Sequence, residues 1–519
     1  MSALKPASAI VVGAGVGGLG AAALLAAAGH DVTVLDRASE PGGKAMAHEV
    51  GGRAIDAGPT VCTMRWVFDD LFAQVGARLE DYLSLSPART LARHAWDDGS
   101  RLDLHADIDE TADAIGRFAG AADARGYRAF CERSQAIHDA LQRPFMSAPR
   151  TTVAGLIWRA GLSGLPALAR ISPFQRLWPA LGEHFSDPRL RQLFGRYATY
   201  CGSSPFLAPA TLMLVAHVER SGVWLVEGGM AALARALAAL ARGQGARLRT
   251  GADVVEILVE RGRVAGVRLD SGECLHSDVV VFNGDVAALA DGSLGPGAAR
   301  GLEAHARRWR QSDQRSLSAL TWSVLARSSG FPLSRHNVFF SQDYRAEFDD
   351  LATRRRLPGD PTIYVCAQDR DDQGACAADG ERLLCLVNAP AQADRRWLTD
   401  KEIAACETNA FGRLQRCGLQ LQTLAPIRRT TPEDFAQRFP GTGGALYGPA
   451  SHGWQASFRR LGSRHPLPGL YLAGGSTHPG PGVPMATLSG RLAAAAIEQD
   501  RASMRRWHPG AMPGGISMR

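Results

Sequence analysis

The sequence predicts an α/β fold built on a parallel sheet, and three observations predict it. Residues 9–12 (AIVV) are an apolar run typical of a buried strand, and a glycine-rich turn joins them to an Ala- and Leu-rich helix ended by Gly29. A second apolar strand follows at 31–35, with an acidic residue directly after it. A further strand, glycine-rich loop and helix occupy residues 469–497. Strands that alternate with helices in this way are typical of a parallel sheet covered by helices.

Length and composition are those of a globular protein. The 519 residues suggest two to four domains, or one large α/β domain with insertions. A net charge of +7 suits an anionic membrane surface or a phosphate-bearing cofactor as well as nucleic acid. Because no zinc-ligand spacing and no dense basic and aromatic stripe occurs, we expect neither a metal site nor a nucleic-acid partner. The nine cysteines are scattered without a CxxC pair, which predicts reduced thiols and a cytosolic protein.

One uncharged stretch, residues 10–29, is long enough to cross a bilayer and also resembles a signal peptide. Six of its 20 residues are glycine, and their placement fits a ligand-binding turn better than a membrane helix. No other stretch is long and apolar enough to span, so we expect no transmembrane helix.

The turn after the first strand has the GxGxxG pattern of a Rossmann-type dinucleotide site, at residues 13–18. Gly13 allows a tight turn, Gly15 lets the backbone approach a pyrophosphate, and Gly18 lets the helix pack close to the sheet. The helix N-terminus offers free N–H groups and a partial positive charge to phosphates. Asp36, at the end of the second strand, is placed to accept hydrogen bonds from ribose hydroxyls. The alternative is a glycine-rich loop with no ligand.

Further glycine-rich segments favour FAD over NAD. Gly42-Gly43-Lys44 follows Asp36 closely, Gly58-Pro59-Thr60 comes next, and the loop 474–485 presents another strand end and helix N-terminus. An extended FAD needs this additional backbone, although Gly42-Gly43 taken alone fits a plain hairpin turn. The predicted cofactor-binding residues are Gly13, Gly15, Gly17, Gly18, Asp36, Arg37, Gly42, Gly43, Lys44, Gly58, Pro59, Thr60, Val254, Gly474, Gly475, Thr477, His478, Pro484 and Met485.

The middle of the chain carries further strands and helices. Four strands are expected as a β-meander beside the parallel sheet, at 245–249, 252–259, 264–269 and 277–282. The predicted segments, in chain order, are a first part of the FAD-binding core (1–110), a helical lid or membrane-contact region (111–215), a second part of the core (216–290), an α+β substrate domain (291–440), a C-terminal return to the core (441–497) and a flexible tail (498–519).

Residues 150–182 are a basic amphipathic stretch. They include Arg159, Arg170 and Arg176, no acidic residue, and apolar side chains such as Trp158. Such a stretch can lie in a membrane interface. The alternative is a helical lid packed on the protein's own core, with the arginines facing water.

Several segments carry a family resemblance. They are VVGAGVGGLGAAALLAAAGHDVTVLDR, EPGGKA, DAGPTV, GVWLVEGGMAALARAL, SDVVVFNGD and GLYLAGGSTHPGPGVPMATLSG. Together they resemble the bacterial carotenoid desaturases of the phytoene desaturase family, within the amine-oxidase-like flavoproteins. The segment TMRWVFDDLF at 63–72 resembles the branch that acts on 1-hydroxy- or methoxy-carotenoids. Lys44 stands where the family's GGR motif has arginine, and Met485 follows Pro484 where the family commonly has glycine.

The resemblance implies an FAD enzyme that desaturates an acyclic carotenoid, most closely at C-3,4 of a 1-hydroxy- or 1-methoxy-carotenoid, with hydride transfer to flavin N5. It also implies peripheral contact with the inner or photosynthetic membrane from the cytoplasm. The electron acceptor stays open between oxygen and a quinone. Three alternatives remain: a phytoene desaturase, an FAD amine oxidase, and a non-enzymatic prenyl-protein escort of the same fold.

No Ser/His/Asp set or carboxylate pair marks a catalytic site in the sequence. Tyr200 and His478 are the candidates, and each has a structural alternative, as a core tyrosine and as a hydrogen-bonding loop histidine. A site must hydrogen-bond a hydroxyl in order to select strongly for it. Thr63, Arg65 and Trp66 are the candidate partners of that hydroxyl, because they follow the DAGPTV segment.

Overall fold

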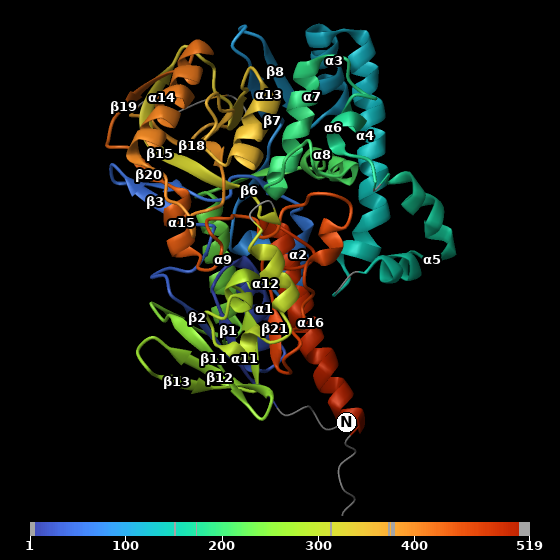
Figure 1. Ribbon diagram of the computed structural model, residues 1–519, viewed down its shortest axis with the longest axis vertical. Helices are drawn as coiled ribbons and strands as arrows, with labels where there is room; N and C mark the ends of the chain where they lie inside the picture. Colours follow the sequence, from blue (N-terminus) through green and yellow to red (C-terminus); the bar gives the residue numbers. More distant parts are fainter. Residues whose placement is uncertain are drawn as a thin grey trace, which may run out of the picture.

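The computed structural model describes residues 6–149, 152–172, 174–311, 314–371, 374 and 379–507. Figure 1 shows a parallel sheet in the lower half of the view, a second sheet in the upper half and a group of helices beside the second sheet. These parts correspond to the expected α/β cofactor-binding core, the α+β substrate domain and the helical region.

A five-stranded parallel sheet forms the core of the lower half. Its strands, in spatial order, are β10 (Arg247–Thr250), β2 (Asp31–Asp36), β1 (Ser8–Val12), β14 (Val279–Phe282) and β21 (Leu470–Leu472). Alternate residues of β1 face opposite layers, because side chains alternate along a strand: Val11 packs in one hydrophobic cluster and Ile10 in the other. The strand order reverses at β1, so the ends of β1 and β14 define the switch point where such sheets bind ligands.

Two strands expected in the meander belong to this parallel sheet instead. β10 pairs with β2 and β14 pairs with β1, both in parallel, so that part of the prediction was wrong. All four residues of β14 are buried, which is the pattern of an interior parallel strand. The antiparallel meander has three strands, β11 (Val254–Glu260), β12 (Arg263–Leu269) and β13 (Cys274–His276).

Three helices pack in one hydrophobic cluster with the parallel sheet: α1 (Val16–Ala27), α9 (Met230–Gly243) and α16 (Val483–Trp507). Helices α1 and α16 lie against each other so closely that a Cβ atom on Gly490 would stand 2.0 Å from the carbonyl oxygen of Gly17. Residues 498–507, expected in the tail, continue α16 as helix, because the helix extends past its packed half. The remainder of the predicted tail, 508–519, lies outside the described residues.

The second sheet is mixed. Its strands, in spatial order, are β19 (Gln420–Thr423), β15 (Ser318–Ser329), β18 (Glu381–Ala389), β17 (Ile363–Ala367), β16 (His336–Phe339), β7 (Thr90–Ala95) and β8 (Arg101–His105), with β20 (Arg428–Thr430) paired to β15. The predicted boundary placed β7 and β8 in the cofactor core, and the parallel pairing of β16 with β7 shows that this was wrong. Helix α14 (Asp400–Arg416) packs on one face of this sheet.

A group of helices stands beside the second sheet (Figure 1). It consists of α3 (Ile108–Ala119), α4 (Ala121–Leu141), α5 (Val153–Arg170), α6 (Leu177–Leu181), α7 (Pro188–Gly195) and α8 (Leu214–Arg220). Helix α5 projects from the body at the right of the view, and it is kinked at Gly161, whose φ is +63°. No helix in the described part of the chain is long and apolar enough to cross a membrane.

The remaining elements connect these layers. They are β3 (Ala47–Val50), β4 (Arg53–Asp56), β5 (Cys62–Thr63), α2 (Trp66–Gln74), β6 (Leu85–Pro87), β9 (Val223–Val226), α10 (Val286–Ala290), α11 (Pro296–Ala299), α12 (Glu303–Trp309), α13 (Tyr344–Asp349) and α15 (Pro432–Arg438). The eight cysteines in the described ranges are free thiols.

Candidate active site

The glycine turn after β1 is held by a residue that the sequence analysis missed. Asn283, directly after β14, donates from Nδ2 to the Gly13 carbonyl oxygen over 3.0 Å. A Cβ atom on Gly15 would lie 2.9 Å from the same Nδ2, and one on Gly18 would lie 2.2 Å from the Gly13 oxygen. The glycines are therefore required by close packing of the turn itself. The signal for Asn283 was the NGD sequence after a buried strand, because polar residues at that strand end reach the switch point.

The N-terminus of α1 fits an anionic group. Its N-cap is Gly15, no side chain caps it, and its first turn contains no acidic residue. The first N–H groups of a helix have no partner within the helix, so here they remain available to a phosphate. Gly13, with φ of +99°, turns the chain into this position.

Asp36 lies at the end of β2 with its carboxylate directed at the glycine turn. Its two oxygens accept hydrogen bonds from the amides of Ala14 (2.6 Å) and Ala38 (2.8 Å). Burial raises the pKa of Asp36, and those two backbone hydrogen bonds oppose the shift. A carboxylate has about four acceptor positions, so two remain for a ribose. Arg37 instead faces the surface, with Nε 3.7 Å from the Asp253 carboxylate.

Val254, predicted to contact the cofactor, is instead packed in the protein interior. Its side chain is buried in the hydrophobic cluster between the parallel sheet and the meander. The nearby chain does approach Asp36, because the amide of Ala252 donates to the Asp36 carbonyl oxygen over 2.9 Å. Direct contact of Val254 with a cofactor stays a prediction.

The second glycine pair lies against the first turn. The amide of Gly42 donates to the Ala14 carbonyl oxygen over 2.8 Å, and Gly42 forms a parallel bridge with Gly15. Lys44 donates from Nζ to the Leu446 carbonyl oxygen over 2.6 Å and lies over the Phe439 ring. Burial lowers the pKa of Lys44, and the Asp285 carboxylate opposes this. Contact of Lys44 with a phosphate stays a prediction.

The C-terminal loop forms a second helix N-terminus beside the first. The amide of Gly474 donates to Ser489 Oγ over 2.6 Å, and Thr477 Oγ1 donates back to the Gly474 carbonyl oxygen over 2.7 Å. Arg460, which the sequence analysis missed, donates to the Gly475 carbonyl oxygen over 3.1 Å. Burial lowers the pKa of Arg460 to about 10. The loop therefore has a buried cation next to it.

A cavity of about 360 Å³ adjoins these loops. Gly58, Pro59 and Thr60 line it, as does the segment 479–485 with Pro484 and Met485. The second sheet supplies another wall: Leu384, Leu386 and Asn388 of β18 face the cavity, whereas Leu383, Cys385 and Val387 face α14. The alternation of strand side chains thus separates the cavity wall from the core beneath α14. Most of the lining side chains are apolar.

Neither catalytic candidate is free to act as a base. His478 is buried, and its Nε2 lies 2.9 Å from the Phe145 carbonyl oxygen. Burial lowers the pKa of His478 to about 4, so the ring is neutral at pH 7. Tyr200 lines the cavity, but its hydroxyl donates to Glu219 Oε1 over 2.5 Å, and burial raises its pKa. His478 fits its structural alternative, whereas Tyr200 lines the cavity and is not an ordinary core tyrosine. A catalytic role for either stays a prediction.

Of the three candidate substrate-binding residues, only one lies on the cavity wall. Thr63 lines the cavity, together with its neighbour Met64. Arg65 does not: it forms ion pairs with Asp69 and Glu80 and stacks over Trp224, 4.8 Å from the ring centroid. Trp66 packs in a small cluster behind the wall. Neither Arg65 nor Trp66 lines the cavity, since helix α2 begins at Trp66. Contact of these two residues with a substrate stays a prediction.

Among the residues that the structure describes, one group of side chains has ligand atoms close enough for a metal. His138, Asp139 and His217 bring ligand atoms within 4.8 Å of one another. Arg220 donates to Nδ1 of His217 over 3.0 Å. A guanidinium on that nitrogen competes with a cation, so this group supports no metal site.

The paired glycine turns, two helix N-termini and an adjoining apolar cavity define a flavin-dependent oxidoreductase. A family model described as flavin containing amine oxidoreductase matches residues 16–498. The chain belongs to this family, and within it to the carotenoid desaturases, and its cofactor is FAD.

Two relatives and one solved structure are similar to this chain over nearly its whole length. It is 53% identical to a hydroxyneurosporene desaturase of Rubrivivax gelatinosus, over 98% of this chain and 97% of that protein. It is 45% identical to a hydroxyneurosporene desaturase of Cereibacter sphaeroides, over 96% and 98%. An oxidoreductase from Methanosarcina mazei has the same fold, with a TM-score of 0.60 and 18% identity over 95% of this chain and 100% of that one.

Proposed function

We propose that this protein desaturates acyclic carotenoids that carry a 1-hydroxy or 1-methoxy end group, at C-3,4. The observation that carries the proposal is the mainly apolar cavity joined to the cofactor loops, in a chain 53% identical to a hydroxyneurosporene desaturase. Apolar walls suit a polyene and exclude water from its reacting carbons. That identity favours this proposal over a phytoene desaturase, an amine oxidase or an escort protein.

The reaction removes two hydrogens from adjacent carbons, one as a hydride and one as a proton. FAD, when bound, supplies the two-electron acceptor for the hydride. The part of the protein is to hold the allylic carbons beside the loops 58–60 and 479–485 and to keep water out. The electron acceptor that reoxidises the cofactor stays open between oxygen and a quinone.

The projecting α5 supports peripheral contact with a membrane. Its side chains Trp158 and Leu162 are 82% and 88% exposed, and Phe174 beyond it is 75% exposed. Large exposed apolar groups gathered on one projection are typical of an interaction surface. Leu156 of the same helix, and Ile171 just after it, line the cavity. We therefore propose that α5 lies in the membrane interface and that the substrate enters beside it, on the cytoplasmic side of the inner or photosynthetic membrane.

The test supplies 1-hydroxyneurosporene, phytoene and an amine separately to the purified flavin-loaded protein with an artificial electron acceptor. We expect a red shift of the visible absorption with 1-hydroxyneurosporene, because the polyene lengthens. Conversion of phytoene alone would support a phytoene desaturase, and peroxide release with amines would support an amine oxidase. Protein purified without flavin absorption would support the escort.

A further inference from the structure

Two buried polar atoms on the cavity wall have no hydrogen-bond partner. They are the hydroxyl oxygen of Tyr344 and Oε1 of Glu347. Both residues are less than a tenth exposed, and both line the cavity. They stand three residues apart on α13, so their side chains lie on the same face of that helix. Leaving a buried polar atom unpaired destabilises the fold, which indicates that a ligand group completes these two.

The other oxygen of Glu347 is firmly held. Its Oε2 accepts hydrogen bonds from Ser341 Oγ and Thr362 Oγ1, each over 2.7 Å. With Oε2 held in this way, Oε1 is the carboxylate oxygen that has no hydrogen-bond partner in the protein. The ring of Tyr344 is also fixed, edge-on to Phe348 with centroids 5.0 Å apart.

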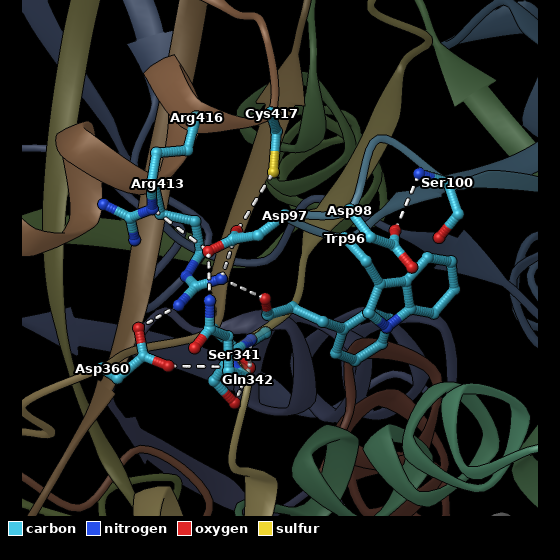
Figure 2. Close-up of polar contacts among 12 residues, drawn as sticks. Trp96, Asp97, Asp98, Ser100, Ser341, Gln342, Asp360, Arg413, Arg416 and Cys417 are labelled. Atoms are coloured by element: carbon cyan, nitrogen blue, oxygen red, sulfur yellow. Dashed lines mark hydrogen bonds and ion pairs between the residues drawn. The ribbon is translucent and has the colours of Figure 1, made fainter.

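A buried arginine positions the segment that carries Ser341. Arg413 of α14 pairs with Asp97 over 2.6 Å and with Asp360, and it donates to the Phe340 carbonyl oxygen. Figure 2 shows this network, in which Gln342 also bonds to Asp360. Phe340 and Gln342, on either side of Ser341, are therefore held in place by hydrogen bonds. Their positions fix the Ser341 hydroxyl that donates to Glu347.

Strand β17 and Thr362, the residue just before it, connect Glu347 with the cofactor side of the cavity. Tyr364 of β17 lies 2.7 Å from Thr60 Oγ1, on the glycine-rich loop 58–60. Thr362, the partner of Glu347, lies two residues earlier on the same face, about 7 Å along the strand. Residues 362–364 thus link Glu347 to the glycine-rich loop 58–60 through two hydrogen bonds.

We propose that Tyr344 and Glu347 bind the terminal hydroxyl of the substrate: the Tyr344 hydroxyl donates to its oxygen, and the Glu347 carboxylate accepts its hydrogen. A hydroxyl offers one donor and acceptor lone pairs, so it satisfies both atoms at once. A carotenoid without the hydroxyl leaves both atoms buried and unpaired, and the site rejects it for that reason.

The inference rests on the proposed function, since it needs a substrate with a 1-hydroxyl group. It also replaces Arg65 and Trp66 as partners of that hydroxyl. Two other hydroxyl groups of the wall are already hydrogen-bonded: Tyr200 bonds to Glu219, and Tyr364 bonds to Thr60. Burial raises the pKa of Glu347 to about 7, so a large fraction of the carboxyl groups is ionised and accepting above that pH.

The test compares 1-hydroxyneurosporene with 1,2-dihydroneurosporene, which lacks only the hydroxyl. We expect Tyr344→Phe to lower kcat/KM for the hydroxylated compound roughly ten- to hundredfold and to leave the other compound unchanged. The variant removes one unpaired oxygen, so folding should be retained. Glu347→Gln turns an acceptor into a donor, and it should favour the 1-methoxy compound over the hydroxylated one. Val338→Ala, at an apolar lining position, is the control and should affect both compounds equally.

Equilibrium binding, followed by quenching of tryptophan fluorescence, separates this inference from the proposed function. Tighter binding of the hydroxylated compound to the wild type, lost in Tyr344→Phe, supports the inference even if no desaturation occurs. Equal loss on both compounds, or no loss on the hydroxylated one, overturns it. Desaturation of the hydroxylated compound with unchanged selectivity in Tyr344→Phe overturns the inference and leaves the proposed function standing.

Discussion

The amide of Ala14 donates a hydrogen bond of 2.6 Å to the carboxylate of Asp36, which lies 22 residues further along the chain. This contact joins the turn after β1 to the end of β2. It couples the glycine turn predicted to receive a phosphate to the acid predicted to receive the ribose. The same carboxylate therefore shapes the loop as well as offering acceptors to a ligand.

We expect Asp36→Ala to lower FAD occupancy and also to destabilise the protein. The substitution leaves the amides of Ala14 and Ala38 without their acceptor, at a cost of about 1–3 kcal/mol each. The ratio of flavin to protein absorbance after gel filtration and a urea titration measure the two effects. Asp31→Ala, at the exposed start of β2, is the control and should keep its flavin. Full flavin retention in Asp36→Ala would remove this residue from the cofactor site.

We expect Gly490→Ala to separate α16 from α1. The added Cβ atom would lie 2.0 Å from the Gly17 carbonyl oxygen, a backbone atom that cannot move aside alone. Overpacking of this kind costs about 1–3 kcal/mol, and the displaced helix N-termini should release flavin. Gly20→Ala is the matched control, because its Cβ would meet a leucine side chain at 3.4 Å, an ordinary contact. Equal melting temperatures for the two variants would disprove the close approach.

We expect the double variant Trp158→Ser, Leu162→Ser to remain in the supernatant when the wild type sediments with anionic vesicles. Each side chain would bury apolar area worth about 1.5–3 kcal/mol in the interface. Trp397→Ser, at a tryptophan 64% exposed outside α5, is the control and should sediment as the wild type does. Sedimentation of the double variant would show that α5 is a lid and not an anchor.

The arginines of this stretch are a poorer choice for that experiment. Arg159 donates from Nε to the Pro144 carbonyl oxygen over 2.9 Å, so its replacement would also disturb the base of the projection. The side chain of Arg170 lies outside the described residues.

We expect the free energy of unfolding to fall as the pH is lowered from about 6.5 towards 4. Burial lowers the pKa of His94 and His336 to about 3 and that of His478 to about 4, against about 6.5 in the unfolded chain. Between these values the unfolded chain binds protons that the folded chain does not, so acid favours unfolding. At pH 5 the loss is about 2 kcal/mol per histidine. The raised pKa of Glu347 acts in the opposite direction between about pH 4.5 and 7.

Urea midpoints at pH 7.5 and 5 measure this effect. His94→Gln should show a smaller shift than the wild type, since its contribution to the pH dependence is removed. Identical midpoints for the wild type at the two pH values would contradict the burial of neutral histidines.

The sequence alone determined the N-terminal cofactor-binding unit of this protein and the C-terminal return of the chain to it. The order of strand, glycine turn, helix and strand from 9 to 36 is confirmed, because the steric demands of the turn and the periodic burial act over about 25 consecutive residues. The return of the chain at 469–497 is confirmed for the same reason, as β21 joins the parallel sheet.

Tertiary structure decided what depends on contacts between distant segments. Local patterns do not show that β7 joins the second sheet through β16, nor that Asn283 closes the turn at Gly13. They named Thr63, Arg65 and Trp66 as partners of the substrate's hydroxyl, but only Thr63 lines the cavity, and the Arg65 guanidinium pairs with Asp69 and Glu80. Tyr344 and Glu347 line the cavity because the fold brings α13 to Thr362, just before β17, and a helix of six residues carries no sequence signal of what lies opposite it. Side-chain direction in a short element is set by its packing partners, and those are fixed by the whole fold.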